Sequence, residues 1–227
     1  MHLFKFHCFD ILDSTQKYAI RRAPAHMSAI LAIEQSSGVG KPGSIWHSPP
    51  GNLYVTYVLP LSNKPNHSII QATTVAVLNT LHQFPCEIKW LNDVTLNNKK
   101  LSGIICDKLA DSMLIGIGIN LKTYNDEYNS ASALKPTSIL HETGVELGAL
   151  EVAEVCGQNL VKALNDDANL IRSKFGEKLM HKGQLVKCEC KDKNIYGIVK
   201  GISEDGKLII EANGLEIHLI DCKIVLN

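Results

Sequence analysis

A glycine-rich stretch early in the chain most strongly limits the folds that this sequence can adopt. Residues 36–52 read SSGVGKPGSIWHSPPGN, and residues 38–43 form a literal G-x-G-x-x-G. In a dinucleotide-binding fold, this motif follows a strand, opens a helix and precedes by about 20 positions an acidic residue that binds the ribose. The apolar run at residues 29–33 meets the first condition, because it is typical of a short strand.

The other two conditions fail. Pro49 and Pro50 follow almost at once, and prolines stop a helix and favour an extended chain. Residues 35–86 contain no Asp or Glu. A P-loop is excluded as well, because Ser44 stands where the P-loop lysine should be. The stretch is therefore predicted to be a loop between two strands, whose N–H groups and Lys41 suit an anion.

The composition is that of an ordinary globular protein. Of the 227 residues, 45% are hydrophobic and 20% are charged, and 23 Lys and Arg balance 23 Asp and Glu. A neutral balance carries no electrostatic footprint for nucleic acid, so we expect no DNA partner. The N-terminal residues lack the apolar region of a signal peptide and no run approaches membrane-spanning length, which predicts a cytoplasmic protein without a membrane partner.

The seven cysteines are predicted to be reduced thiols, since their number is odd and no export signal is recognisable. Cys188 and Cys190 form the one close pair, and alternation in a strand would place both thiols on one face. A metal site would need further ligands at suitable spacing. None is evident nearby, so we assign this pair no metal.

Periodicity divides the chain into a mixed part and a β-rich part. Strands are expected at residues 3–9, 28–33, 53–59, 87–90, 94–96, 101–107 and 113–120, and helices at residues 15–22, 68–84 and 147–164, with 170–175 as a continuation or a further helix. After Gly183, short strands alternate around the turn dipeptides at 205–206 and 213–214. This pattern predicts a small all-β barrel from about residue 180 onward.

Four stretches coincide with one family. They are residues 12–16 (LDSTQ), 35–51 around the glycine-rich loop, 89–93 (KWLND) with 99–104 (KKLSGI), and 116–120 (GIGIN). In this order and spacing they resemble bacterial biotin–protein ligases, also called biotin–[acetyl-CoA-carboxylase] ligases. The chain is similar to the short form of that family, without the DNA-binding domain of its repressor-type members.

The resemblance implies an α+β fold with a mixed central β-sheet and flanking helices, of the class II synthetase-like biotin ligase type. A small C-terminal SH3-like β-barrel would follow. We expect residues 1–179 to form the catalytic biotin- and ATP-binding domain and residues 180–227 to form the small β domain.

The resemblance also implies a two-step reaction with ATP and Mg²⁺. The biotin carboxylate attacks the α-phosphate, which gives biotinyl-5′-AMP and pyrophosphate, and a lysine on the biotin carboxyl carrier domain of an acyl-CoA carboxylase then attacks the mixed anhydride. Because the first step brings two anions together, the protein must supply positive charge, oriented N–H donors and exclusion of water. A monomer or weak homodimer is expected.

Site residues are carried over from the family by position. Lys100 matches the essential lysine, whose mobile ammonium can bridge the biotin carboxylate and the α-phosphate. The residues implied around biotin are Ser14, Thr15, Gln35, Gly38, Val39, Trp46, Lys100, Gly103, Gly116 and Gly118. Those implied around the nucleotide are Gly40, Lys41, Asn92, Asp93 and Asn120, and Asp93 and Asn120 are also the metal candidates. His47 has no partner at a useful spacing and is assigned no catalytic role.

The glycine-rich loop departs from the family pattern, which is arginine-rich. Val39, Lys41 and Ser44 stand at usual arginine positions, and Pro42 lies in the same loop. Leu91 replaces a usual proline. Losing bidentate arginine donors should weaken the hold on phosphate and adenylate. Our hypothesis is an active ligase that retains its adenylate less firmly, with Lys41 partly substituting.

Two alternatives stay open on the sequence alone. One is a lipoate or octanoyl carrier-protein ligase, which shares the overall fold. The other is a non-catalytic protein that binds biotin or a carrier domain. The K-W-x-N-D stretch and the glycine-rich loop favour biotin, and the presence of Lys100 argues against a protein without catalysis.

Overall fold

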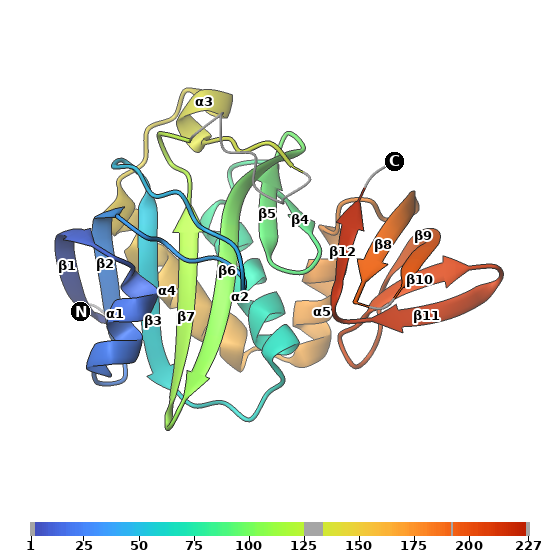
Figure 1. The fold of residues 1–227 in the computed structure, drawn as a ribbon, viewed down its shortest axis with the longest axis horizontal. Helices are drawn as coiled ribbons and strands as arrows, with labels where there is room; N and C mark the ends of the chain where they lie inside the picture. Colours follow the sequence, from blue (N-terminus) through green and yellow to red (C-terminus); the bar gives the residue numbers. More distant parts are fainter. Residues whose placement is uncertain (1–2, 125–133, 192, 226–227) are drawn as a thin grey trace.

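The computed structural model describes residues 3–124, 134–191 and 193–225, which form a large α/β unit and a smaller β unit beside it (Figure 1). The large unit is built on a seven-stranded sheet with the order β1-β2-β3-β7-β6-β5-β4. Its strands are β1 (Lys5–Leu12), β2 (Ser28–Gln35), β3 (Leu53–Pro60), β4 (Glu87–Lys89), β5 (Asp93–Leu96), β6 (Lys99–Leu109) and β7 (Ser112–Ile119). Strands β1 and β2 pair in parallel and all other neighbours pair antiparallel, so the predicted mixed sheet is confirmed.

Helices cover one face of this sheet. Helices α2 (Asn66–Thr80), α4 (Ala149–Asn165) and α5 (Ala168–Glu177) pack behind it, whereas α1 (Thr15–Arg22) and the loop at residues 36–52 lie on the opposite face (Figure 1). Helix α1 begins where the sequence predicts, because the Ser14 hydroxyl accepts a hydrogen bond from the backbone N–H of Lys17. Helix α5 is separate from α4, since Asp167 caps its start.

Alternation along β7 separates the two faces. Met113, Ile115, Ile117 and Ile119 belong to the main hydrophobic core beneath the helices. Gly116 and Gly118 lie on the other face, where a Cβ atom would meet Gln16 and Trp46 respectively. Successive residues of a strand point to opposite faces, so β7 supports the core and opens a groove with the same eight residues.

Strand β6 contains a β-bulge at the point where Lys100 enters the groove. Val94 pairs with Ser102, but Thr95 pairs with Lys100, so Leu101 is the extra residue in β6. Strict alternation counted back from Gly103 would place Lys100 on the helix-covered face. The bulge changes this phase and brings Lys100 to the groove side, which is a common use of bulges beside functional sites.

The β5–β6 hairpin turns at two residues with positive φ. Asn97 and Asn98 have φ angles of 51° and 60°, which is the geometry of a two-residue type I′ turn. Lys99 and Lys100 therefore belong to β6, which begins two residues before the strand expected at residues 101–107. The short helix α3 (Ile139–Thr143) supports this hairpin, since Glu142 accepts hydrogen bonds from Asn97 and Lys99.

The smaller unit is one five-stranded antiparallel sheet with the order β11-β10-β9-β8-β12. Its strands are β8 (Leu185–Cys190), β9 (Asn194–Ile202), β10 (Leu208–Ala212), β11 (Leu215–Leu219) and β12 (Cys222–Val225). In the described ranges its edge strands β11 and β12 do not pair, so the pairing does not close the predicted barrel. One of its contacts with the large unit is made by the Trp90 indole, which donates to the carbonyl of Ile220 at 3.1 Å. Strand β12 faces the large unit in Figure 1.

No helix in the described ranges is long and apolar enough to cross a membrane.

Candidate functional site

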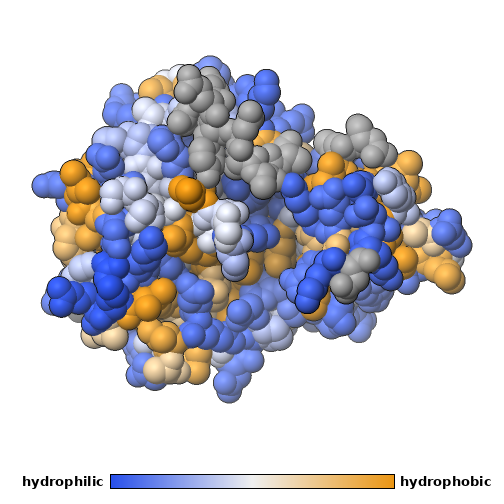
Figure 2. All heavy atoms as spheres, viewed as in Figure 1, coloured by the Kyte–Doolittle hydropathy of each residue, from blue (hydrophilic) through white to orange (hydrophobic). Residues whose placement is uncertain are grey.

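A pocket of about 360 Å³ opens on the face of the sheet that the large helices leave uncovered. Its walls come from the glycine-rich loop, from β3, β6 and β7, and from the start of β12. In the space-filling view, hydrophilic side chains border the hollow between the two units (Figure 2). Among the residues that line the pocket are these sequence-predicted ones: Ser14, Thr15, Gln35, Val39, Gly40, Lys41, Trp46, Asn92, Asp93, Lys100, Gly103, Gly116, Gly118 and Asn120. The structure thus brings together fourteen predicted residues from stretches far apart in the chain.

Gly38 is the predicted residue that does not line the pocket. A Cβ atom there would lie 2.4 Å from the carbonyl oxygen of Trp46 and 2.6 Å from the Ser48 hydroxyl. Gly38 and Trp46 are also joined by a backbone hydrogen bond. The absence of a side chain at Gly38 therefore lets the loop fold back on itself, and its role is in loop geometry.

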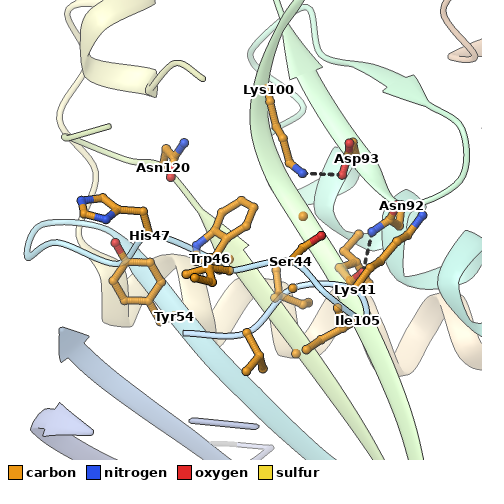
Figure 3. A pocket seen from close by; sticks show the side chains of 18 of the residues that line it. Lys41, Ser44, Trp46, His47, Tyr54, Asn92, Asp93, Lys100, Ile105 and Asn120 are labelled. Atoms are coloured by element: carbon orange, nitrogen blue, oxygen red, sulfur yellow. Dashed lines mark hydrogen bonds and ion pairs between the residues drawn. The ribbon is translucent and has the colours of Figure 1, made fainter. Parts of the chain in front are cut away.

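The Trp46 indole lies across the groove (Figure 3). A Cβ atom on Gly118 would come within 2.5 Å of the ring, and one on Gly103 within 2.7 Å. These two glycines therefore make room for Trp46 in this conformation. The sequence analysis had instead expected biotin to lie directly against them. The Trp46 Nε1 is buried and has no hydrogen-bond partner among the described residues. A ligand oxygen in the pocket would satisfy it.

A buried hydrogen-bond network forms the closed end of the pocket. Gln35 Oε1 accepts from the backbone N–H of Thr15 at 2.8 Å and from the Thr15 hydroxyl at 3.2 Å. Gln35 Nε2 donates to the Ser48 hydroxyl at 2.8 Å, which ties the network to the glycine-rich loop. Ser14 is 1% exposed, and its oxygen caps α1 through a long contact of 3.4 Å. The Ser14 hydroxyl proton and one Gln35 amide hydrogen remain to bind a polar ligand ring.

Thr56 supports this network from the floor. It is fully buried, and its hydroxyl lies 2.9 Å from the Thr15 hydroxyl and 3.0 Å from Gln16 Oε1. Gln16 in turn donates to Asp107 at 2.8 Å. Because Thr15 donates to Gln35 and Gln16 Oε1 can only accept, Thr56 is the donor to both, and its single proton is shared between the Thr15 oxygen and Gln16 Oε1. Thr56 therefore fixes the direction of the Thr15 hydroxyl, and sequence reasoning missed it because it appeared to be one residue of an apolar strand.

The open end of the pocket is centred on an ion pair. Lys100 Nζ lies 2.9 Å from an Asp93 carboxylate oxygen and 5.3 Å from the centre of the Trp46 ring (Figure 3). The Lys100 and Asp93 side chains are 22% and 14% exposed. Lys100 thus lies at the open end beside Trp46, with a counter-ion that holds its ammonium in position.

Among the described residues that line the pocket, four are lysines and one, Asp93, carries a carboxylate. Lys41, Lys89, Lys100 and Lys223 line the pocket together with Asp93. Burial lowers the pKa of Lys89, Asp93 raises it, and the charges of Lys100, Lys223 and Lys41 lower it further. Burial likewise lowers the pKa of Lys41, against the opposing effect of Asp93. Like charges gathered in a pocket indicate an anionic ligand, although the chain as a whole is neutral.

Two of these lysines were missed by sequence reasoning. Lys89 is only 5% exposed, and lysine is almost never so buried without a partner or a function. Its place in the K-W-L-N-D stretch was a usable signal. Lys223 comes from the smaller unit, so its position depends on how the two units meet. No local sequence pattern predicts that it reaches the pocket.

Asn120 and Asn92 both lie at the pocket, and each uses an amide hydrogen on the backbone. Asn120 Nδ2 donates to the carbonyl of Thr137, and Asn92 Nδ2 donates to the carbonyl of Ile104, both at 2.9 Å. The oxygens of Asp93 and Asn120 are hard donors of the kind that Mg²⁺ prefers. Two such groups fit a metal held mainly by phosphates, and the described residues contain no group of three or more His, Cys, Asp or Glu that could hold a metal by themselves.

Asn52 is a further residue that the sequence did not single out. It is 2% exposed, and its Oδ1 accepts from the backbone N–H groups of Leu121, Lys122 and Thr123 at 2.9, 3.0 and 3.1 Å. Its Nδ2 donates to the Tyr54 hydroxyl at 2.9 Å. Asn52 therefore fixes the chain that follows Asn120 against the end of the glycine-rich loop.

Comparison with known families places the chain. Residues 9–123 match the biotin/lipoate A/B protein ligase family, and residues 181–221 match the biotin protein ligase C-terminal domain. The chain belongs to the biotin/lipoate A/B protein ligase family.

Individual relatives agree with this assignment. The bifunctional ligase/repressor BirA of Escherichia coli is 30% identical over 222 residues, which cover 90% of this chain and 68% of BirA. A biotin–[acetyl-CoA-carboxylase] ligase of Paracoccus denitrificans is 27% identical over 221 residues, which cover 87% of this chain and 90% of that protein. The biotin protein ligase of Aquifex aeolicus, solved in complex with biotin and ATP, has the same fold, with a TM-score of 0.86, 23% identity and 97% of each chain covered.

Proposed function

We propose that this protein is a biotin–protein ligase that forms biotinyl-5′-AMP from biotin and ATP and transfers biotin to a lysine of a biotin carboxyl carrier domain. The observation that carries the proposal is the position of Lys100. It is paired with Asp93 at 2.9 Å in one pocket whose lining combines neutral, hydrogen-bonding side chains with three further lysines. An uncharged ring with a polar edge suits the neutral side chains, and a polyphosphate suits the lysines.

In the first step, a biotin carboxylate oxygen bonds to the α-phosphorus of ATP and the bond to the β-phosphate oxygen breaks, releasing pyrophosphate. We assign Lys100 to bridge the two anions and to reduce their repulsion. Ser14, Thr15 and Gln35 would hold the ureido ring, and Gly116 would leave room beside it. Val39 and Trp46 would cover the ligand and exclude water.

On the phosphate side, we assign the backbone of Gly40 and the ammonium groups of Lys41 and Lys89 to the nucleotide. Asn92 and Asn120 are the amide contacts. Asp93 and Asn120 would hold Mg²⁺, which supplies charge neutralisation on the phosphates when it is bound. The chain's own contribution is to fix the two anions in reach of each other.

In the second step, the amine of an acceptor lysine attacks the carbonyl carbon of the mixed anhydride, and AMP leaves with the pair of bonding electrons. The amine must be neutral to attack, so its proton passes to a base or to solvent. We expect the adenylate to be held less firmly than by an arginine-rich loop, because Lys41 is a point charge without bidentate donors.

The test is pyrophosphate release by the purified protein with ATP and either biotin or lipoate. We expect release with biotin, little with lipoate, and a loss of about a thousandfold or more in Lys100→Ala, since a positioned charge of this kind is worth several kcal/mol. Lys108→Ala is the matched control, because Lys108 lies on the same strand outside the pocket lining and donates to the Lys64 carbonyl. Equal release by Lys100→Ala and Lys108→Ala would refute the assignment.

Adenylate retention has its own test. The purified enzyme is incubated with biotin, ATP and a bystander protein, and biotin incorporated into the bystander is compared with that of Lys41→Arg. We expect the variant to label the bystander less. Equal labelling by the two proteins would count against loose retention while leaving the ligase assignment intact.

A further inference from the structure

Three of the seven cysteines gather at one place in the smaller unit. Cys222 of β12 pairs in register with Cys190 of β8, and Ile224 pairs with Cys188. Residues two apart in a strand share a face, and directly opposed residues share it as well, so Cys188, Cys190 and Cys222 all lie on one face of the sheet. The sequence predicted that Cys188 and Cys190 share a face, but it gave no sign of the third thiol.

The three thiols differ in their surroundings. Cys188 is fully buried, whereas Cys190 and Cys222 are partly exposed. The thiols of Cys188 and Cys222 interact, and this interaction lowers the pKa of Cys188 and raises that of Cys222. Cys222 lies diagonally across from Cys188 on the neighbouring strand, so a disulfide requires the two sulfur atoms to approach to the bond length of about 2.05 Å.

Cys222 is also part of the pocket wall. The residues just before it carry the contact between the two units, since the Ile220 carbonyl accepts from Trp90 of the K-W-L-N-D stretch. The charge of Asp221 acts on Lys41 in the glycine-rich loop and raises its pKa against the effect of burial. A change in the position of Cys222 would therefore reach both Trp90 and Lys41.

We propose that Cys188 and Cys222 are an oxidation site that controls the pocket: a low-molecular-weight disulfide converts them to a disulfide, and the bond slows adenylation. Cys222 reacts first because it is the partly exposed thiol of the pair, although its raised pKa keeps the thiolate fraction small: its thiolate attacks the oxidant, forming a mixed disulfide and expelling one thiolate. The Cys188 thiolate then attacks the Cys222 sulfur and expels the second. Two protein thiols are oxidised, the disulfide oxidant is reduced to two thiols, and the two protein protons pass to these products.

The effect on catalysis rests on the proposed function, whereas the bond itself does not. A bond from Cys222 to Cys188 would move the start of β12 relative to the glycine-rich loop. The carbonyl that holds Trp90 and the carboxylate near Lys41 move with it. Because small misplacements in a catalytic site lower rates strongly, we expect pyrophosphate release to fall about tenfold or more on oxidation and to return with a reducing agent.

The experiment treats the full chain with oxidised glutathione, blocks the remaining thiols by alkylation, and maps disulfides by mass spectrometry alongside pyrophosphate release. We expect a Cys188–Cys222 link in the wild type. Cys188→Ala should keep its activity under oxidation. Cys190→Ser, changed on the same strand and face, should lose activity as the wild type does, and Cys8→Ser controls for an exposed thiol on a distant strand.

Each outcome decides the proposal. A link between Cys190 and Cys222, full activity of the linked protein, or equal loss of activity in Cys188→Ala would overturn it. If the reduced protein releases no pyrophosphate at all, the proposed function fails, and the disulfide map still tests the thiol pair. A reversible loss of pyrophosphate release on oxidation that is absent in Cys188→Ala, but present in Cys190→Ser and Cys8→Ser, would establish the proposal.

Discussion

The two faces of the central sheet differ although the same strands build both. On β7, Ile115 and its odd-numbered neighbours fill the core, whereas Gly116 and Gly118 leave open the space that Gln16 and Trp46 occupy. The helix-covered face contributes stability through contact with large side chains. The pocket face lacks large side chains at these positions, and this leaves space for a ligand. It is covered by the glycine-rich loop and the short helix α1, which hydrogen bonds hold in place. Burial thus serves packing on one side and positioning on the other.

The largest effects should come from changing one residue on each face of β7. Ile115→Ala removes a fully buried side chain, and we expect a loss of about 3 kcal/mol in the free energy of unfolding with KM values nearly unchanged. Gly118→Ala places a Cβ atom 2.5 Å from Trp46. The indole must move, so kcat/KM should fall about a hundredfold with little loss of stability.

Urea unfolding and steady-state kinetics on both variants check this contrast. The proposed difference between the faces would be contradicted if Gly118→Ala proves as unstable as Ile115→Ala. It would also be contradicted if Ile115→Ala alters KM for biotin as strongly as Gly118→Ala does.

A second effect should appear at the hairpin that carries Lys100. Hydrogen bonds from Lys99, Thr137 and Asn97 lower the pKa of Glu142 to about 2. Because the folded pKa lies below the unfolded one, this stability is present above about pH 4.5 and is lost as the pH falls toward 2. Lys99 is 40% exposed, and screening by solvent reduces the contribution to about 1–2 kcal/mol.

Glu142→Gln should therefore lose about 1–2 kcal/mol near neutral pH and little near pH 2. The measurement is the denaturant midpoint of unfolding of the wild type and of Glu142→Gln at several pH values across this range. A loss that stays constant as the pH falls would show that the Glu142 charge is not the source of the stability.

A smaller effect is expected on the floor of the pocket. Thr56→Val keeps the shape of the side chain but removes the hydroxyl that orients Thr15. One buried hydrogen bond is worth about 1 kcal/mol, so KM for biotin should rise about fivefold while KM for ATP stays the same. Thr56→Ser should restore the wild-type value. A matching rise in both KM values would indicate a general distortion of the pocket.

The smallest effect concerns charge at the other end of the pocket. Because the pKa of Lys89 is lowered, Lys89 loses its proton at a lower pH than a lysine in water. Affinity for ATP should therefore weaken as the pH rises from about 7 to about 9.5, and this pH dependence should be shallower in Lys89→Met. KM for ATP across that range is the measurement, and equal slopes in the two proteins would exclude Lys89 from the phosphate site.

The local features were predictable from the sequence because they depend on neighbouring residues. Ser14 caps α1, and a hairpin joins β5 to β6 at Asn97 and Asn98, as capping and turn chemistry require. Lys100 and Asp93 could be identified because both lie in short motifs. These are contacts that a few adjacent residues determine.

The remaining features depend on the tertiary structure. Lys223 and Cys222 reach the pocket from a unit more than a hundred residues away from the motifs, and Thr56 acquires its role only beneath Thr15. The alternation in the C-terminal segment predicted strands correctly, but it could not determine whether the edge strands β11 and β12 meet to close a barrel. Closure depends on the tilt and stagger of all the strands together, which leaves no local pattern.

The bulge at Leu101 has a consequence for how the hairpin tolerates insertions and deletions. With Leu101 deleted, Val94–Ser102 and Thr95–Lys100 would become ordinary neighbouring pairs, so Lys100 would keep its direction toward the groove. If Leu101 stayed and the bulge were lost, strict alternation would instead point Lys100 toward the hydrocarbon beneath α2, where an unpaired ammonium costs several kcal/mol. A library that varies the length of this hairpin should therefore remove Leu101 first, because at that position a single deletion leaves the inside and the outside of the strand unchanged.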